Sequence, residues 1–474
     1  MATVTDLCFL PARELARLIR QREVSAAEVM EAHLTRIEQV NPSLNAIVTL
    51  VADEARHAAG QADTLLSSGA QLGPLHGLPV AHKDLVPTKG IRTTFGSPIF
   101  ADFVPDEDAL LVQRLHAAGA ITIGKTNTPE FGAGSQTFNE VFGATRNPYD
   151  VEMTCGGSSG GAAVALSTGM VPLADGSDMG GSLRNPASFC NVVGLRPSPG
   201  RVAVWPRRTG SFPSPSVSGP MARTVADVGL MLSVLAGPDD RDPCSLDQGG
   251  APFAQSLDRD VTGCRVAWSP DLGGLPVDTR VATVIEDQRQ VFASLGCVVE
   301  DATPDLSDAD EVFRAWRAWY CELAFGELLD QHRNQIKDTM VWNIEAGRQL
   351  SGPDVGRMAQ QLGALQERVR LFMERYEYLV LPVSQVPPFD VTQPYVTEIN
   401  GEALDTYIDW MRSCYYISVT GLPAISVPCG FTPEGLPVGI QIVGRHRDEL
   451  SLLHMAYAFE QATKVGERHP PIPV

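Results

Sequence analysis

A stretch rich in glycine and serine, running from Gly156 to Pro186, constrains this chain more than any other feature. Residues 156–161 read Gly-Gly-Ser-Ser-Gly-Gly, and residues 179–182 read Met-Gly-Gly-Ser. Glycine lets the backbone take positive φ and approach a ligand closely, at a cost in chain entropy. An acyl-transfer site needs a hydroxyl that attacks a carbonyl carbon and backbone N–H groups that receive the oxyanion. The stretch therefore predicts two tight turns that present Ser158 and Ser182 beside a row of backbone amides.

A lysine follows an apolar run upstream of these turns. The segment Gly77–Asp84 reads Gly-Leu-Pro-Val-Ala-His-Lys-Asp. Burial lowers the pKa of a lysine because desolvation disfavours the ammonium form, and a neutral lysine can replace histidine as the base that activates serine. A surface lysine at the end of a strand is the ordinary alternative. Lys83 follows four residues expected in the interior, and at this point a buried base and a surface lysine both stay open.

These motifs together resemble the amidase signature family of serine hydrolases. The similarity spans most of the chain and is densest between about 75 and 225. Three departures from the family pattern leave the proposed catalytic side chains untouched: Cys155 replaces a common proline, Ser177 a common threonine and Leu183 a common isoleucine. The matching segments are Gly77–Asp84, Gly124–Asn127, Asn147–Pro148, Gly156–Pro197, Gly421–Ile425 and Leu436–Gln441.

The resemblance implies a role for each site residue. Lys83 corresponds to the catalytic lysine, Ser158 to a bridging serine with a cis peptide bond, and Ser182 to the nucleophile. The oxyanion hole would consist of the backbone N–H groups of Met179, Gly180, Gly181 and Ser182. Supporting roles are expected for Asp178 and Arg184, which would fix the oxyanion loop by charge-assisted hydrogen bonds, and for Ser159, which would bond within its turn.

Alternating helical patterns and short apolar strands predict an α/β fold. We expect three α/β/α layers, with a central mixed sheet covered by helices on both faces. Strand candidates are 46–51, 120–123, 378–381, 424–427 and 438–443. No linker, repeat or low-complexity tract divides the 474 residues, so we predict one domain over 1–474 with a signature core at about 75–225.

Between about 306 and 375 the strand signals vanish and aromatic residues gather at helical spacing. We interpret this segment as a helical insertion near the substrate pocket, although helical spacing of aromatics fits ordinary core equally well. A proline-rich loop follows the strand that ends at Leu381, and ligands in open α/β sheets lie beyond the carboxyl ends of strands. The residues predicted to line the pocket are therefore Trp316, Trp319, Tyr320, Gln385 and Val386.

One segment of the chain matches a nucleotide-binding motif by sequence pattern alone. Residues Gly119–Thr126 satisfy the P-loop pattern G-x-x-x-x-G-K-[ST]. In a P-loop a strand precedes the first glycine and the four variable positions form a phosphate-cradling loop. Here a helix is expected before Gly119, and the variable positions are themselves the strand, so we reject nucleotide binding.

Net charge and cysteine content limit which binding partners and which cellular compartment are expected. The net charge of −19 disfavours nucleic acid and anionic membranes as partners, because both select for basic surfaces. The nine cysteines include no Cys-x-x-Cys pair, which favours a reducing cytoplasm. The chain has no His-Glu-x-x-His motif and no apolar run approaching 18 residues, so neither a metal site nor a membrane span is expected. The proposed chemistry needs no cofactor.

The sequence thus predicts an amidase that cleaves a carboxylic amide or related C–N acyl bond, with bulky or aryl substrates favoured by the aromatic segment. Carbamate (urethane) or aryl ester hydrolysis by the same triad is the first alternative, because these substrates form the same tetrahedral intermediate. The glutaminase subunit of a transfer-RNA amidotransferase is another, weakened because Thr128-Pro129-Glu130-Phe131 departs from the usual Met-Asp-Glu-Phe. A catalytically silent binding protein is the third. The expected partner is a small-molecule amide, carbamate or ester, and a homodimer is left open.

Overall fold

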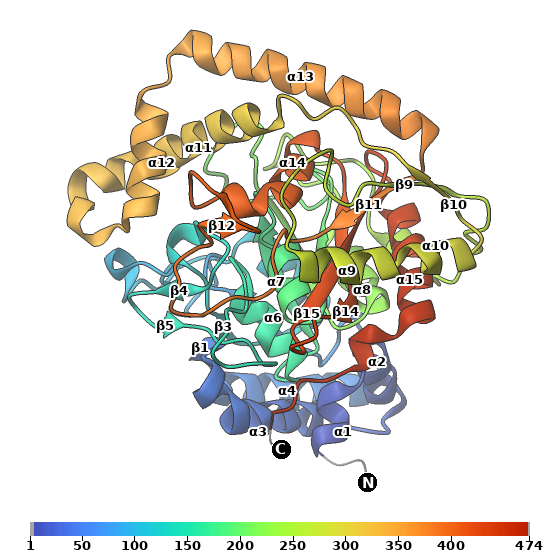
Figure 1. The fold of residues 1–474 in the computed structure, drawn as a ribbon. Coiled ribbons are helices and arrows are strands. Elements are labelled where there is room, and N and C mark those ends of the chain that lie inside the picture. Colours follow the sequence, from blue (N-terminus) through green and yellow to red (C-terminus); the bar gives the residue numbers. More distant parts are fainter. Residues whose placement is uncertain (1–3, 473–474) are drawn as a thin grey trace.

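One eleven-stranded mixed sheet runs through the computed structural model, which describes residues 4–472 (Figure 1). In spatial order its strands are β1 (Ile47–Leu50), β3 (Ile121–Thr126), β2 (Pro79–Lys83), β6 (Leu173–Asp178), β8 (Val217–Ala222), β7 (Val193–Arg196), β14 (Ala424–Phe431), β15 (Pro437–Val443), β11 (Tyr378–Pro382), β9 (Arg265–Trp268) and β10 (Val298–Asp301). Two short hairpins lie outside it: β4 (Phe138–Asn139) with β5 (Gly143–Ala144), and β12 (Glu398–Ile399) with β13 (Glu402–Ala403).

Strand direction changes along the sheet. β3, β2 and β6 are parallel neighbours, and so are β11, β9 and β10. The strands from β6 through β8, β7, β14 and β15 to β11 pair antiparallel. Because β2 and β6 are parallel and adjacent, their carboxyl ends open at the same edge of the sheet. The lysine motif and the second glycine turn therefore leave the sheet side by side.

Fifteen α-helices are described within residues 4–472. Their bounds are α1 (Val4–Phe9), α2 (Ala12–Gln21), α3 (Ala26–Leu44), α4 (Ala52–Ser67), α5 (Leu110–Ala117), α6 (Gly160–Ser167), α7 (Arg184–Phe189), α8 (Val225–Leu235), α9 (Thr279–Asp287), α10 (Arg289–Ser294), α11 (Ala309–His332), α12 (Asp338–Arg348), α13 (Gly352–Arg375), α14 (Arg412–Thr420) and α15 (Glu449–Thr463). None is both long and apolar enough to cross a membrane, within the part of the chain that the structure describes.

Both faces of the sheet are buried under helices, as β11 illustrates. Successive side chains of a strand point to opposite faces. Tyr378 and Val380 pack into the cluster built by α5, α8, α10 and α15, whereas Leu379 and Leu381 pack into the cluster built by α11, α13 and α14. Helices α3, α4 and α6 cover the same face as the latter group at the β1–β3–β2 end. The predicted three-layer α/β/α fold with a mixed central sheet is confirmed.

The segment from 309 to 375 consists of α11, α12 and α13, which form a helical cap at the top of the view in Figure 1, at the opposite end from α1–α4 and the two termini. Helix α11 contacts both α12 and α13. Helix α13 begins at a capping box, in which the side chains of Ser351 and Asp354 each accept a hydrogen bond from the other residue's backbone N–H.

The P-loop-like motif has the conformation that its sequence suggested. Helix α5 ends just before Gly119, and residues 121–126 are strand β3. The Nζ of Lys125 donates to the carbonyl of Val86 and to the hydroxyls of Thr88 and Thr93, at 2.8 and 3.2 Å for the two hydroxyls. This lysine ties a neighbouring loop to the sheet instead of cradling a phosphate.

Candidate active site

Lys83 is the last residue of β2, and its side chain is buried beneath the first glycine turn. Its Nζ donates to three serine hydroxyls: Ser158 at 2.8 Å, Ser159 at 2.9 Å and Ser177 at 3.2 Å. None of these groups is charged, so the ammonium form has no directly bonded anion to stabilise it. The site therefore holds a lysine among hydroxyls.

Burial sets the protonation state of this lysine. Desolvation lowers the pKa of Lys83 to about 7, against a smaller opposing effect from the negative charges of Asp178 and Asp175. An ordinary lysine stays protonated until about pH 10.4. At neutral pH a large fraction of Lys83 is therefore the free amine, which can accept a proton.

Ser158 lies in the first glycine turn, just before α6. The peptide bond between Gly157 and Ser158 is cis, as the family resemblance implied. Helix α6 starts at Gly160, where an added Cβ would lie 2.3 Å from the hydroxyl of Thr137. The glycine lets the turn pack directly on its neighbours, which holds Ser158 over Lys83.

Ser182 lies in the loop between β6 and α7, beyond the carboxyl end of β6. The backbone N–H of Ser159 donates to the carbonyl oxygen of Ser182 at 3.2 Å, so the two glycine turns are joined directly. Gly181 has φ of 122°, and a Cβ there would lie 2.6 Å from Cβ of Cys414. Only glycine fits this position, which aims the loop at the neighbouring cavity.

The amides of this loop divide into two groups. The N–H groups of Gly181 and Leu183 donate to the carboxylate of Asp178, at 2.8 and 3.1 Å. Among residues 4–472, the amides of Met179, Gly180 and Ser182 donate to no other group. Three of the four amides predicted for the oxyanion hole are thus free to bind a ligand, and the N–H of Gly181 is engaged with Asp178.

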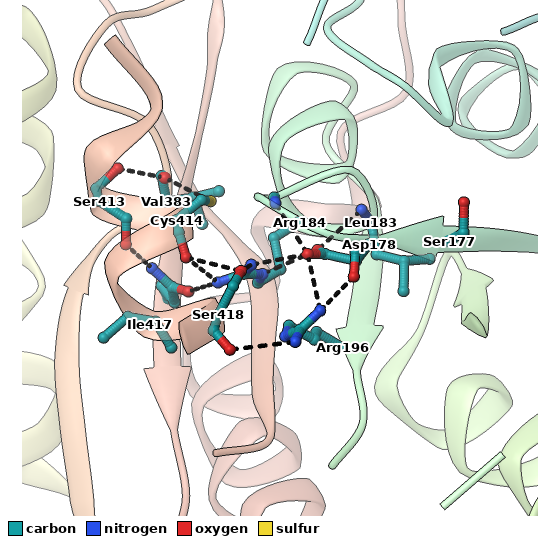
Figure 2. Close-up of polar contacts among 12 residues, drawn as sticks. Ser177, Asp178, Leu183, Arg184, Arg196, Val383, Ser413, Cys414, Ile417 and Ser418 are labelled. Carbon is teal, nitrogen blue, oxygen red and sulfur yellow. Dashed lines mark hydrogen bonds and ion pairs between the residues drawn. The ribbon is translucent and has the colours of Figure 1, made fainter. Parts of the chain in front are cut away.

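A buried ion-pair network fixes this loop (Figure 2). Arg184 donates to both oxygens of Asp178, at 2.9 and 3.0 Å, and Nη1 of Arg196 lies 3.4 Å from Oδ1 of the same carboxylate. Arg184 also reaches α14 through the carbonyl of Cys414 and the hydroxyl of Ser418. Burial alone would raise the pKa of Asp178, but the two guanidinium groups outweigh it and hold that pKa far below its ordinary range.

A second polar chain lies behind Lys83. The Oδ1 of Asp175 accepts the backbone N–H of Lys83 at 3.0 Å, and Oδ2 lies 2.5 Å from Nδ1 of His82. The Nε2 of His82 bonds to the hydroxyl of Thr122, which also meets Nε2 of His116 near the surface. These residues connect the backbone of the lysine to the outside of the sheet.

A cavity of about 740 Å³ opens over the two glycine turns. Ser158, Ser177 and Ser182 lie in its wall, together with the free amides of Met179 and Gly180. The other walls are mainly apolar and aromatic. They include Phe95, Phe100, Phe103, Phe131, Tyr320, Phe325, Met340 and Met411.

Of the five residues predicted to line the substrate pocket, one lies in the wall of this cavity. Tyr320 lines the cavity. Trp316 packs against the core beneath α11, and Trp319 meets Phe212 at 5.9 Å between ring centroids; neither belongs to the cavity wall. Helix α11 reaches the cavity through Arg317, Tyr320 and Cys321, whereas Trp316, one turn before Tyr320, packs into the core.

Gln385 and Val386 do not lie in the wall of this cavity either. Gln385 is fully buried, where its side chain donates to the carbonyl of Pro276 at 3.0 Å and its carbonyl accepts the N–H of Asp278. Val386 is core, packed with the residues under α11 and α14. The loop after β11 therefore supports the fold instead of the pocket.

Several cavity residues were missed from the sequence. Phe95, Phe100 and Phe103 lie in the loop after β2, and their rings contact one another at 5.1 to 6.0 Å between centroids. The rule that ligands lie beyond the carboxyl ends of strands pointed to this loop as strongly as to the loop after β11. Ser177, noted only as a departure from the family pattern, lies in the cavity wall and accepts a hydrogen bond from Lys83.

Comparisons with known proteins agree with this geometry. The family model "Amidase" matches residues 28–453. The chain is 38% identical to an acylamidase of Rhodococcus erythropolis, over 99% of this chain and 98% of the relative. It is 35% identical to a glutamyl-tRNA(Gln) amidotransferase subunit of Geobacillus kaustophilus, over 96% and 98% of the two chains. Among solved structures, a bacterial aryl acylamidase of the amidase signature family superposes with a TM-score of 0.91 at 29% identity, over 98% of this chain and 99% of the other.

The family match, the relatives and the shared fold all lead to one assignment. The match covers most of the chain, and the mixed sheet with its helical layers is the architecture of the similar structures. The protein belongs to the amidase signature family, as an enzyme that hydrolyses carbon–nitrogen bonds in amides other than peptide bonds.

Proposed function

We propose that this enzyme is an acylamidase that cleaves amides bearing a bulky or aryl group, through an acyl-enzyme on Ser182. The observation that carries the proposal is the 2.8 Å contact between Nζ of Lys83 and Oγ of Ser158, in the wall of the cavity that also exposes Ser182. A base, a bridging hydroxyl and a nucleophile in sequence are the parts that nucleophilic catalysis by serine requires.

In the first half of the reaction, neutral Lys83 takes a proton from Ser158, which takes one from Ser182. The Oγ of Ser182 then attacks the carbonyl carbon of the amide. The free amides of Met179, Gly180 and Ser182 receive the oxyanion, where each pre-aligned donor contributes on the order of 3 kcal/mol. The Asp178–Arg184 pair holds this loop in place before the substrate arrives, so little reorganisation is needed.

In the second half, the same relay returns the proton to the nitrogen of the leaving amine. Protonation matters because an amide anion is a poor leaving group. The C–N bond breaks, and the acyl group stays on Ser182 as an ester. Water then enters, loses a proton through Ser158 to Lys83 and attacks the ester, and the relay returns that proton to Oγ of Ser182 as the C–O bond breaks and the acid leaves. Ser159 and Ser177 hold Nζ of Lys83 near Ser158 throughout.

The aromatic walls of the cavity support a bulky or aryl substrate. Phe131 and Phe325 pack at 4.6 Å between ring centroids, with Tyr320 beside them. Such rings favour another aromatic group through offset or edge contacts. The acylamidase relative and the aryl acylamidase structure are consistent with this choice. Esters and carbamates share the tetrahedral intermediate, so we expect side activity on them.

All nine cysteines are free thiols. Free thiols are usual in a reducing compartment, and we propose the cytoplasm as the location.

The test is an assay of the purified chain alone on acetanilide, propionamide, glutamine, a phenyl carbamate and a nitrophenyl ester. Our proposal predicts the highest kcat/KM among the amides on acetanilide, without any partner protein. Turnover of glutamine above that of acetanilide would support the alternative of a glutaminase that works within an amidotransferase. Preference for the carbamate over every amide would instead assign the enzyme to urethane hydrolysis.

A further inference from the structure

Three arginines in the wall of the catalytic cavity, Arg208, Arg317 and Arg447, form no ion pair with any carboxylate among the described residues, and of these only Arg317 is buried. Buried charges in proteins are paired or bind ligands, because removing an ion from water without a counter-charge is costly. Several buried arginines here obey this rule: Arg184 and Arg196 pair with Asp178, and Arg201 pairs with Glu449. The buried Arg36 and Arg223 donate instead to backbone carbonyls, whereas Arg317 has neither a carboxylate nor a carbonyl of the backbone as partner and requires an explanation.

Arg317 lies on α11 and is only 6% exposed. Its Nε donates to Oδ1 of Asn343 at 2.8 Å, and its Nη2 donates to the hydroxyl of Tyr407. Its guanidinium also lies over the rings of Phe313 and Tyr407. All these groups are neutral, and Nη1 donates to no side chain or carbonyl that the structure describes. The neighbours orient the guanidinium without neutralising it.

Arg208 is an exposed residue on the loop before β8, at the mouth of the cavity. Its guanidinium carbon is 5.4 Å from the ring centroid of Phe95 and 5.0 Å from that of Phe325, so the cation is held between two aromatic faces. No carboxylate among the described side chains forms an ion pair with it. The neighbouring Arg207, in contrast, is paired with Asp242. The stacking fixes Arg208 while leaving its N–H groups available.

The acidic residues of the cavity do not supply a counter-charge for Arg317 or Arg208. Asp242 is occupied by Arg207, and Asp106 and Glu107 are solvent-exposed residues of the loop after β2. Lys337 is a further cation near Arg317: burial lowers its pKa most, the carboxylate of Glu130 raises it, and the charge of Arg317 lowers it. Among the described residues of the cavity wall, no carboxylate forms an ion pair with Arg317, in a protein of net charge −19.

We propose that the substrate of this enzyme carries a carboxylate on its aryl group, which Arg317 binds and Arg208 attracts at the mouth. The inference rests on the proposed function and refines it to acylated aminoaryl carboxylates, such as N-acyl aminobenzoates. The aromatic walls take the ring, and the guanidinium of Arg317 takes the carboxylate through charge-assisted hydrogen bonds. Such a substrate would supply the counter-charge that the described side chains lack.

The test compares two substrates of nearly identical shape, 4-acetamidobenzoate and 4-acetamidobenzamide, with the 3-isomers as a second pair. We expect wild-type kcat/KM to favour the carboxylate by about 10-fold to 100-fold, the range for a hydrogen bond to a charged group. Arg317→Gln should bring this ratio close to one, Arg317→Lys should restore part of it, and Arg208→Gln should lower it less. Arg370→Gln, a charge removal on the exposed side of α13 and outside both cavities, should leave the ratio unchanged.

Arg317 also borders a second cavity of about 400 Å³ between α11, α12 and α13. The mode of inhibition by benzoate therefore shows which of the two cavities binds the carboxylate. Benzoate should inhibit competitively against acetanilide, and Arg317→Gln should weaken it. Calorimetry on Ser182→Ala with 4-acetamidobenzoate measures the same contact without turnover, and thermal melts establish that each variant is folded. A wild-type ratio of one, a ratio unaffected by folded Arg317→Gln, or non-competitive benzoate would overturn the inference. Loss of the proposed function would appear separately, as absent turnover of both substrates.

Discussion

The Nζ of Lys83 lies 2.8 Å from the Oγ of Ser158, and both side chains are buried. This contact joins the end of β2 to the first glycine turn, two segments separated by 75 positions in the chain. Because burial lowers the pKa of Lys83 to about 7, the amine can serve as a base at neutral pH. The catalytic account depends on this protonation state.

The activity should therefore depend on pH in a defined direction. Below about pH 7 Lys83 is the ammonium ion and has no lone pair to accept a proton, so kcat/KM should fall about tenfold for each pH unit. Above that value the profile should level off. Rates on acetanilide from pH 5 to 9 measure this. A profile that is flat through pH 7, or that rises only above pH 9, would contradict a neutral lysine base.

Asp175 should influence the pKa of Lys83. Its negative charge raises the pKa of Lys83, in opposition to the larger effect of burial. Replacing it with asparagine keeps the shape and removes the charge, so the acid limb of the pH profile should move to lower pH in Asp175→Asn. An unmoved limb in the folded variant would mean that Asp175 and His82 hold the backbone of Lys83 without influencing its proton.

Asp178→Asn should be strongly destabilising, by about 3–5 kcal/mol, because it leaves Arg184 and Arg196 buried without a counter-charge. Urea unfolding measures this. Since the pKa of Asp178 is depressed in the folded protein, its contribution is present above the ordinary value of 3.8 and is lost as the pH falls below it. Asp301→Asn, which removes an exposed partner of Arg289, is the matched control and should cost far less, because solvent screens that ion pair. An equal loss of unfolding free energy in the two variants would show that the ion-pair network of Asp178 does not stabilise the fold more than an exposed pair does.

The fold and the motif residues could be predicted from the sequence because their signals are local. A run of glycines constrains the backbone wherever it occurs, and short apolar strands alternating with helical patterns indicate a sheet buried on both faces. The approach of Lys83 to Ser158 came instead from the family resemblance, since nothing local specifies which turn lies over which strand end.

The pocket was harder to predict because helical spacing shows that a face is apolar but not what it faces. Along α11, Trp316 and Tyr320 are four residues apart, yet only Tyr320 reaches the cavity. Arg208 carries no periodic signal at all. Its place between Phe95 and Phe325 depends on three loops and helices that meet only in the folded chain.

The residues that line the cavity make a prediction about substrate selectivity. Tyr320→Ala should change the ratio of kcat/KM for acetanilide over propionamide by roughly 10-fold, the scale of a lost apolar contact in a binding pocket. Trp316→Ala should lower the melting temperature without changing that ratio, because Trp316 packs on the core. Identical substrate ratios in both variants would remove Tyr320 from the specificity pocket.

The central claim is that Ser182 is the nucleophile, and covalent labelling tests it most directly. A fluorophosphonate should add one adduct per chain, and peptide mapping should place it on Ser182. Ser182→Ala should keep the wild-type melting temperature, take up no label and lose nearly all turnover, since no other group forms the acyl-enzyme. An adduct on Ser158 or Ser177, or substantial amide hydrolysis by Ser182→Ala, would contradict the account.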